Sequence, residues 1–134
     1  MARRSSRAIK ILVVFLSIMV FPQRKEEGSG VCMAGGISRV WPVGDSAGWT
    51  FGVFRWPNYK PFEAGDVLLF HYKPGMHNVV QVGLQQYEMC ELSGKATVWS
   101  SGDDHVILNR GMSYFISCMP GDCQRGMKIA VTAR

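Results

Sequence analysis

The sequence contains none of the short motifs by which most enzymes are recognised. It has no Ser/His/Asp order, no catalytic carboxylate pair, no glycine-rich phosphate loop and no zinc-ligand spacing among its three histidines and four cysteines. The adjacent carboxylates Asp103 and Asp104 follow Ser101-Gly102 and are predicted to lie in a solvated turn. These absences predict that the protein is not an enzyme.

Charged residues are also scarce, at 19% of the 134 residues, and the basic ones are unevenly placed. The formal net charge is +5, of which +4 falls before residue 37 and +1 from Ile37 onward. The basic excess therefore belongs mostly to the leader, and a nucleic-acid partner is not predicted.

Long hydrophobic runs are absent apart from one of about eleven residues, from Ile11 to Phe21. Four basic residues precede it: Arg3, Arg4, Arg7 and Lys10. This pattern predicts a secretory signal peptide over residues 1–36, with a boundary left open between 30 and 38, followed by a mature domain over 37–134. A short membrane anchor is the alternative. The C-terminus has no apolar tail, so a lipid anchor there is not expected.

Glycine and proline are plentiful, at 15 and 6 residues, and no convincing helical period or internal repeat is found. Turn residues separate short β-prone stretches, which predict an all-β sandwich of two sheets. The expected strands are residues 40–43, 66–72, 77–82, 98–99, 106–108, 113–117 and 127–132. Proline at position 42 makes the first of them an edge strand, and residues 87–95 are expected to be loop or weakly helical.

Sulfur is concentrated between Tyr114 and Met127. Cys118 and Cys123 bracket a Pro-Gly turn, and Met127 follows four residues later. Thiolate and thioether ligands suit a soft metal such as copper, and His77 upstream supplies an imidazole. Cleavage near Gly36 leaves Cys90, Cys118 and Cys123, of which one disulfide and one free thiol are the simplest account; cleavage near Gly30 would retain Cys32.

Several blocks of the sequence together resemble the phytocyanin family, and within it the plantacyanin or basic blue protein branch. The blocks are Val43-Gly44-Asp45-Ser46 with Gly48-Trp49-Thr50, Trp56-Pro57, Ala64-Gly65-Asp66-Val67, Met76-His77-Asn78-Val79-Val80, Ser101-Gly102 and Gly126-Met127-Lys128-Ile129-Ala130-Val131. They run in the family's order over about residues 39–133. The resemblance implies a cupredoxin-like Greek-key sandwich with one disulfide, Cys90 to Cys123, and one copper ion held by two histidines, a cysteine and an axial methionine.

Carried over by position, His77 matches the first histidine ligand and Met127 the axial methionine, but two ligand positions are altered. Ser117 stands where the ligand cysteine belongs, and Asp122 stands where the second histidine belongs. Serine cannot replace a thiolate at ordinary pH, and a carboxylate is a hard donor that favours Cu(II) over Cu(I). His71 and His105 fall at no ligand position and are expected to face solvent or pack.

Cys118 follows the aligned cysteine position by one residue. Neighbouring strand residues point to opposite faces, so its sulfur is aimed away from the metal unless a bulge rotates it back. The alternatives are a buried apolar residue, an exposed thiol, or a pair with Cys32.

Two functions remain open at this point. The first is the family's blue copper electron carrier, with His77, Cys118 and Met127 as ligands and Asp122 or water completing the shell. The second is a copper-poor, redox-silent extracellular domain of the early-nodulin-like kind, which binds a wall component or partner protein. Either is expected to be a secreted monomer of the cell wall space, with no stable membrane anchor and an unidentified redox or wall partner.

Overall fold

The computed structural model describes residues 37–134, whose regular structure is seven strands, one short α-helix and three single-turn 3-10 helices. The strands are β1 (Val40–Pro42), β2 (Val67–His71), β3 (Val79–Val82), β4 (Thr97–Trp99), β5 (Asp103–Ile107), β6 (Gly111–Ile116) and β7 (Lys128–Ala133). The helix is α2 (Leu84–Met89), and the 3-10 turns are η1 (Asp45–Ala47), η2 (Val53–Arg55) and η3 (Cys123–Arg125). No helix in this range is long and apolar enough to span a bilayer.

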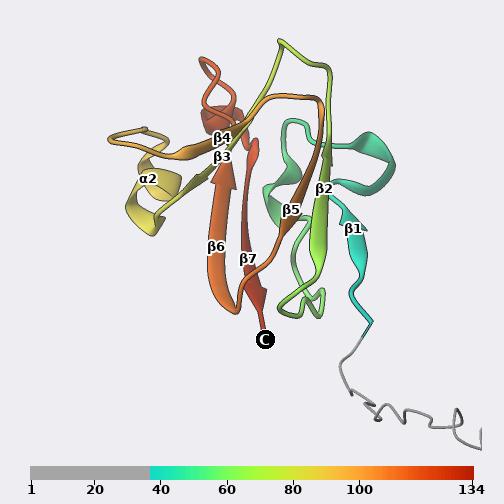
Figure 1. Ribbon diagram of the computed structural model, residues 1–134. Coiled ribbons are helices and arrows are strands. Elements are labelled where there is room, and N and C mark those ends of the chain that lie inside the picture. The colour runs from blue at the N-terminus through green and yellow to red at the C-terminus, as the bar shows by residue number, and fades with distance from the viewer. Residues whose placement is uncertain (1–36) are drawn as a thin grey trace, which may run out of the picture. The chain divides into compact units, whose positions relative to one another are not determined.

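The strands form two sheets that face each other (Figure 1). One has three strands in the order β1-β2-β5, and the other has four in the order β4-β3-β6-β7. β1 pairs parallel with β2, whereas all other neighbours are antiparallel. The predicted two-sheet β-sandwich is thus confirmed, and the strand containing Pro42 lies at a sheet edge as expected.

The core lies between the two sheets because alternate residues of each strand face inward. β2 contributes Leu68 and Phe70, and β7 contributes Ile129 and Val131, all fully buried. Trp49 packs edge-on against Phe70 with ring centroids 4.9 Å apart. This alternation is the same signal from which the strands are predicted.

The prediction of a solvated turn at Asp103 and Asp104 is wrong. Asp103 and Asp104 lie in β5 and not in a turn, because their backbone pairs with the end of β2 in the register His71↔Asp103 and Phe70↔Asp104. Asp104 is buried rather than solvated, and its carboxylate accepts hydrogen bonds from the hydroxyls of Tyr72 and Ser101.

Residues 87–95 are expected from the sequence to be loop or weakly helical. The structure has a short helix, α2, that begins three residues earlier, at Leu84, and ends at Met89. The Gln86 side chain accepts a hydrogen bond from the backbone N–H of Gly83 at 2.8 Å, which satisfies a donor at the start of the helix. The helix is only six residues long, below the length at which a helical period is visible in sequence.

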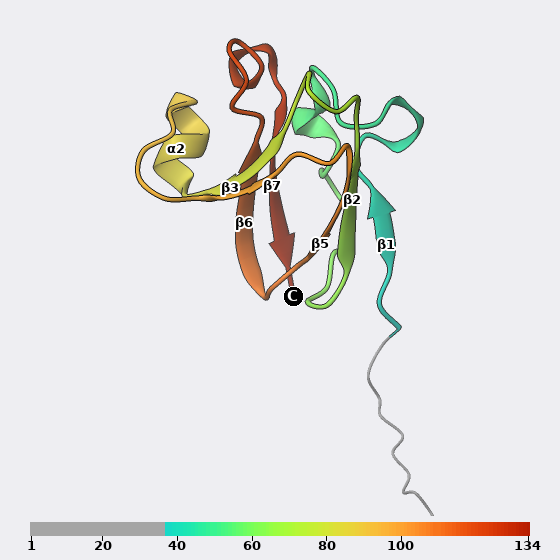
Figure 2. The ribbon, with the colours of Figure 1, turned by 45° about the horizontal axis from the view of Figure 1, so that its top comes forward.

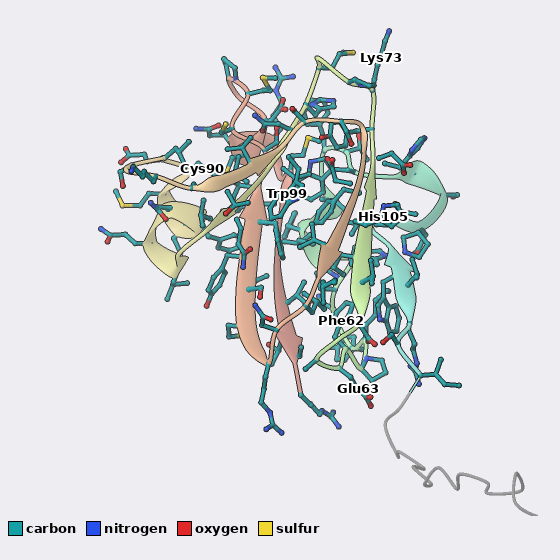
Figure 3. All side chains as sticks on the ribbon, viewed as in Figure 1. Phe62, Glu63, Lys73, Cys90, Trp99 and His105 are labelled. Atoms are coloured by element: carbon teal, nitrogen blue, oxygen red, sulfur yellow. A yellow bond between two sulfur atoms is a disulfide. The ribbon has the colours of Figure 1, made fainter. Side chains whose placement is uncertain are left out.

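Two loops leave the same end of the sandwich, opposite the C-terminus (Figures 1 and 2). They are the β2–β3 loop, residues 72–78, with Lys73 near its tip (Figure 3), and the β6–β7 loop, residues 117–127. Gly102 allows the β2–β3 loop to approach closely, since a Cβ there would lie 2.8 Å from the Tyr72 carbonyl oxygen and 2.6 Å from Pro74 Cγ. This loop end carries every predicted ligand position.

Candidate functional site

His77 is presented by the β2–β3 loop and lies mostly buried at the loop end. Its Nδ1 is 2.6 Å from Oδ2 of Asp122, a residue 45 positions later in the sequence. The ring of Phe51 meets the imidazole edge-on, with centroids 5.6 Å apart. A carboxylate only accepts hydrogen bonds, so the hydrogen lies on Nδ1, and the position of the imidazole is fixed from two sides.

Ser117 and Asp122 are brought together by the tight fold of the β6–β7 loop. The backbone N–H of Ser117 donates to the carbonyl of Met127 at 3.0 Å, and the N–H of Met127 donates to the carbonyl of Asp122 at 3.1 Å. The Ser117 hydroxyl, fully buried, lies 2.7 Å from Asp122 Oδ2. One carboxylate oxygen therefore accepts hydrogen bonds from both Ser117 and His77.

Met127 completes the group of predicted ligand positions. Its side chain is fully buried within the main hydrophobic core, and its backbone is bonded to both Ser117 and Asp122. The structure thus brings four residues together at the loop end: His77, Ser117, Asp122 and Met127. We refer to them as the loop-end cluster.

Cys118 is exposed and carries a free thiol. Its backbone N–H donates to Asn78 Oδ1 at 2.8 Å, and the Asn78 Nδ2 lies 3.2 Å from its Sγ. Of the alternatives considered for this residue, the exposed thiol is the one the structure shows. A pair with Cys32 involves a position outside the described residues.

The disulfide joins Cys90, at the end of α2, to Cys123, at the start of η3. This is the pairing that the resemblance implies. It fastens the helix to the β6–β7 loop, so that the loop is covalently tied on one side and hydrogen-bonded on the other.

Three residues that support this site are not predicted from the sequence: Asn78, Phe51 and Arg125. Asn78 lies within the quoted block Met76 to Val80, yet its side chain contacts both Ser117 and Cys118. Arg125 stacks over Phe51 at 5.3 Å from the ring centroid, which supports the ring that holds His77. The sequence signal for Asn78 was its place beside a predicted ligand, whereas Phe51 and Arg125 had none.

His71 and His105 are not part of the loop-end cluster. His71 ends β2 and His105 lies within β5 (Figure 3), and both are exposed, as expected. Within residues 37–134, no group of three or more histidine, cysteine, aspartate or glutamate side chains is placed to hold a metal ion.

The loop-end cluster does not fit a blue copper ion. Such a centre takes a thiolate and two imidazoles with a weak axial thioether. The cluster offers one imidazole, a hydroxyl, a carboxylate and a thioether. The imidazole Nδ1 is already hydrogen-bonded to the carboxylate. Without a thiolate and a second imidazole, it lacks the donors that give such a centre its colour and its redox cycling.

The chain resembles known proteins over its whole sandwich. Residues 49–127 match the family model described as a plastocyanin-like domain. A chemocyanin of Lilium longiflorum is 54% identical over 96 residues, which cover 72% of this chain and 76% of the relative. Early nodulin-like protein 22 of Arabidopsis thaliana is 40% identical over 94 residues, which cover 68% of this chain and 67% of the relative.

A solved structure gives the same result. The cucumber basic protein, a blue copper protein, superposes with a TM-score of 0.70 at 52% sequence identity. The match covers 71% of this chain and 99% of the cucumber chain. The sandwich of this chain therefore corresponds to nearly the full length of that solved chain.

Proposed function

The chain belongs to the phytocyanin family of plastocyanin-like domains, and within that family we propose that it is a redox-silent member. In this proposal the domain is secreted to the cell wall space and acts by binding a partner, and it does not carry electrons. The observation that carries the proposal is the hydrogen-bonded contact of Asp122 with His77 and Ser117 at the loop end.

The hydrogen bonds of the loop-end cluster support this proposal in a direct way. A metal ion bound through His77 Nδ1 would have to displace the hydrogen between that nitrogen and Asp122 Oδ2. The charge-assisted bond at 2.6 Å would be lost. If Asp122 Oδ2 also turned to the metal, the buried Ser117 hydroxyl would keep only the longer contact with Asn78 Oδ1, at 3.4 Å. The only compensation would come from one imidazole, one hard oxygen donor and a thioether, which is a poor set for Cu(I).

The position of Cys118 also supports the redox-silent role, because its thiol is held away from the loop-end cluster. An electron carrier built on this thiol would need the sulfur to turn from its exposed position into the loop-end cluster. The Asn78 amide bonds both the backbone and the sulfur of Cys118, and Asn78 is itself buried. The backbone carbonyl of Asn78 also accepts a hydrogen bond from the indole N–H of Trp49 at 2.9 Å, so the residue that holds Cys118 is itself fixed to the core.

Titration of residues 37–134 with Cu(II), followed by visible absorption and metal analysis, tests the proposal. Because the cluster offers no thiolate, we expect a colourless protein, or weak d–d bands alone, and less than stoichiometric copper after dialysis. Intense blue absorption with one copper per chain would instead establish the electron carrier that uses Cys118, and would overturn the proposal.

A further inference from the structure

A shallow groove of about 560 Å³ runs between α2 and η3, beside the disulfide. Phe54 and Met89 form its apolar sides, and the Cys90–Cys123 bridge lies between them in the lining. Gly126 allows Phe54 to pack closely, because a Cβ at that glycine would lie 3.1 Å from Phe54 Cδ1. We call this hollow the α2 groove.

The α2 groove exposes two large apolar side chains in its lining. Phe54 is 43% exposed and Met89 is 56% exposed. Met89 also lines a second hollow together with Leu84, but the other side chains there are mostly polar, so the apolar surface is centred on Phe54 and Met89. Flexible thioethers next to an aromatic ring are typical of surfaces that receive an apolar side chain.

The cations of the α2 groove are held by aromatic rings and not by carboxylates. Arg125 lies over the ring of Phe51, and Lys128 lies 4.5 Å from the centroid of Tyr87 and donates to the Tyr87 carbonyl. Arg55 does not line the groove, but its guanidinium lies over the ring of Phe54, 5.3 Å from the centroid. Within residues 37–134, no lysine or arginine side chain lies within 4 Å of a carboxylate oxygen, so these three cations have no acidic partner in the described domain.

The lining contains one carboxylate, Glu88, and two cations, Arg125 and Lys128. The groove therefore combines an apolar wall with an excess of positive charge. Charge complementarity calls for an anionic occupant, and the Phe54–Met89 wall calls for an occupant that also carries an apolar side chain.

We propose that the α2 groove binds an acidic peptide segment of a partner protein, with an apolar side chain against Phe54 and Met89 and carboxylates against Arg125 and Lys128. The inference rests on the binding role proposed above. A peptide is favoured over an acidic polysaccharide, because a sugar chain has carboxylates but no apolar side chain to fill the wall.

An NMR titration of ¹⁵N-labelled residues 37–134 with synthetic peptides tests the inference; this domain corresponds to 99% of a relative solved as a chain of its own. The probe is acetyl-Asp-Glu-Leu-Phe-Glu-Asp-amide. We expect amide shifts confined to residues around Phe54, Met89 and Gly126, and weaker binding at high salt. Versions in which Leu-Phe is replaced by Gly-Ser, or the acids by lysines, should bind at least about tenfold more weakly.

Matched variants separate the α2 groove from the rest of the surface. Arg125→Glu should weaken the peptide's binding by roughly tenfold, and Lys128→Gln by a smaller factor. Arg110→Glu, at an exposed arginine in the β5–β6 turn that is not part of the groove, should leave binding unchanged. The amide spectrum of each variant shows whether it remains folded.

Three results would overturn the inference: no shifts at millimolar peptide, equal binding of acidic and basic peptides, or binding insensitive to Arg125→Glu. Shifts in the groove with oligogalacturonate in place of the peptide would identify a carbohydrate ligand and would also overturn it. The copper titration is independent of all of these results. A blue protein that binds the peptide would refute the redox-silent role alone.

Discussion

At the scale of single residues, Asp122 determines the chemistry of the loop end. Its Oδ2 lies 2.6 Å from the imidazole of His77 and 2.7 Å from the hydroxyl of Ser117. Each of these groups is nearly or fully buried, so each needs a hydrogen-bond partner inside the protein. The carboxylate supplies that partner, and the cluster satisfies its own polar groups.

The double variant Ser117→Cys with Asp122→His should gain a blue copper centre. The two changes place a thiolate and a second imidazole beside His77 and Met127, which is the donor set that the family's copper requires. We expect intense visible absorption and one bound Cu(II) per chain from the double variant, and neither from the unmodified domain. Absorption titration and metal analysis provide the measurement.

Cys118→Ser in the same double variant is the control. Its colour should be unchanged, because the thiolate comes from position 117 and Cys118 is exposed. A double variant that folds but stays colourless would show that the backbone of the β6–β7 loop, and not two side chains alone, prevents copper binding.

At the scale of elements, one buried carboxylate adds to the backbone pairing that holds β1 against β2. Asp66, just before β2, accepts hydrogen bonds from the backbone N–H groups of Arg39 and Glu63 and from the indole of Trp41 at 2.8 Å. Burial alone would raise the pKa of Asp66, but these hydrogen bonds outweigh it and lower the pKa below its ordinary value of 3.8. The charged form therefore stabilises the edge of the three-stranded sheet.

Asp66→Asn should lower the free energy of unfolding by about 1–3 kcal/mol, as expected for buried donors left without their acceptor. Because the folded pKa lies below 3.8, this difference should be constant from pH 5 to 7 and should shrink as the pH falls below about 4. Urea unfolding at a series of pH values measures it. Asp103→Asn, an exposed carboxylate on β5, should show no such difference; if it matched Asp66→Asn, general acid expansion would explain the result.

Local sequence patterns could predict the strands but not every boundary. β7 was predictable because its alternating buried residues Ile129 and Val131 show the strand period. The start of β5 was not, since Gly102-Asp103-Asp104 has turn chemistry, and only pairing with β2, far away in the chain, overrides it.

The candidate site could be predicted as positions but not as contacts. The Pro-Gly-Asp-Cys sequence places Ser117 and Asp122 at the altered positions once the family pattern is known. That one oxygen of Asp122 reaches both Ser117 and His77 depends on the folding of two distant loops onto each other. The hydrogen bond between Asn78 and Cys118 could not be predicted for the same reason, since its partners are 40 residues apart in the sequence.

At the scale of the whole molecule, Tyr72 links the two sheets near the loop end. Its hydroxyl contacts the carboxylate of Asp104 on β5 and the carbonyl of Trp99 on β4, strands that belong to opposite sheets. Burial, together with the hydrogen bond to Asp104, raises the pKa of Tyr72 to about 12. The neutral phenol is the form that stabilises the sandwich.

Tyr72→Phe should lower the free energy of unfolding by about 1–2 kcal/mol at pH 7, since the Asp104 carboxylate loses a donor. In the unmodified domain, the stability that depends on the raised pKa is complete below pH 10 and is lost as the pH rises from about 10 to 12. The difference between the two proteins should therefore narrow over that interval in denaturant unfolding curves. A difference that stays constant to pH 12 would show that the phenol does not titrate with folding.

The exposed thiol of Cys118 also has a consequence for how the chain matures. Cys118 is five residues from Cys123 along the chain, whereas the native partner Cys90 is 33 residues away. Short loops close faster and at lower entropic cost, so the first bridge formed by an oxidising chain should often be the wrong one, across the Pro-Gly turn. The native bridge then forms when the Cys90 thiolate attacks the Cys123 sulfur, which makes the Cys90–Cys123 bond and releases Cys118 as a thiolate, so the yield of native protein should depend on the rate of this exchange.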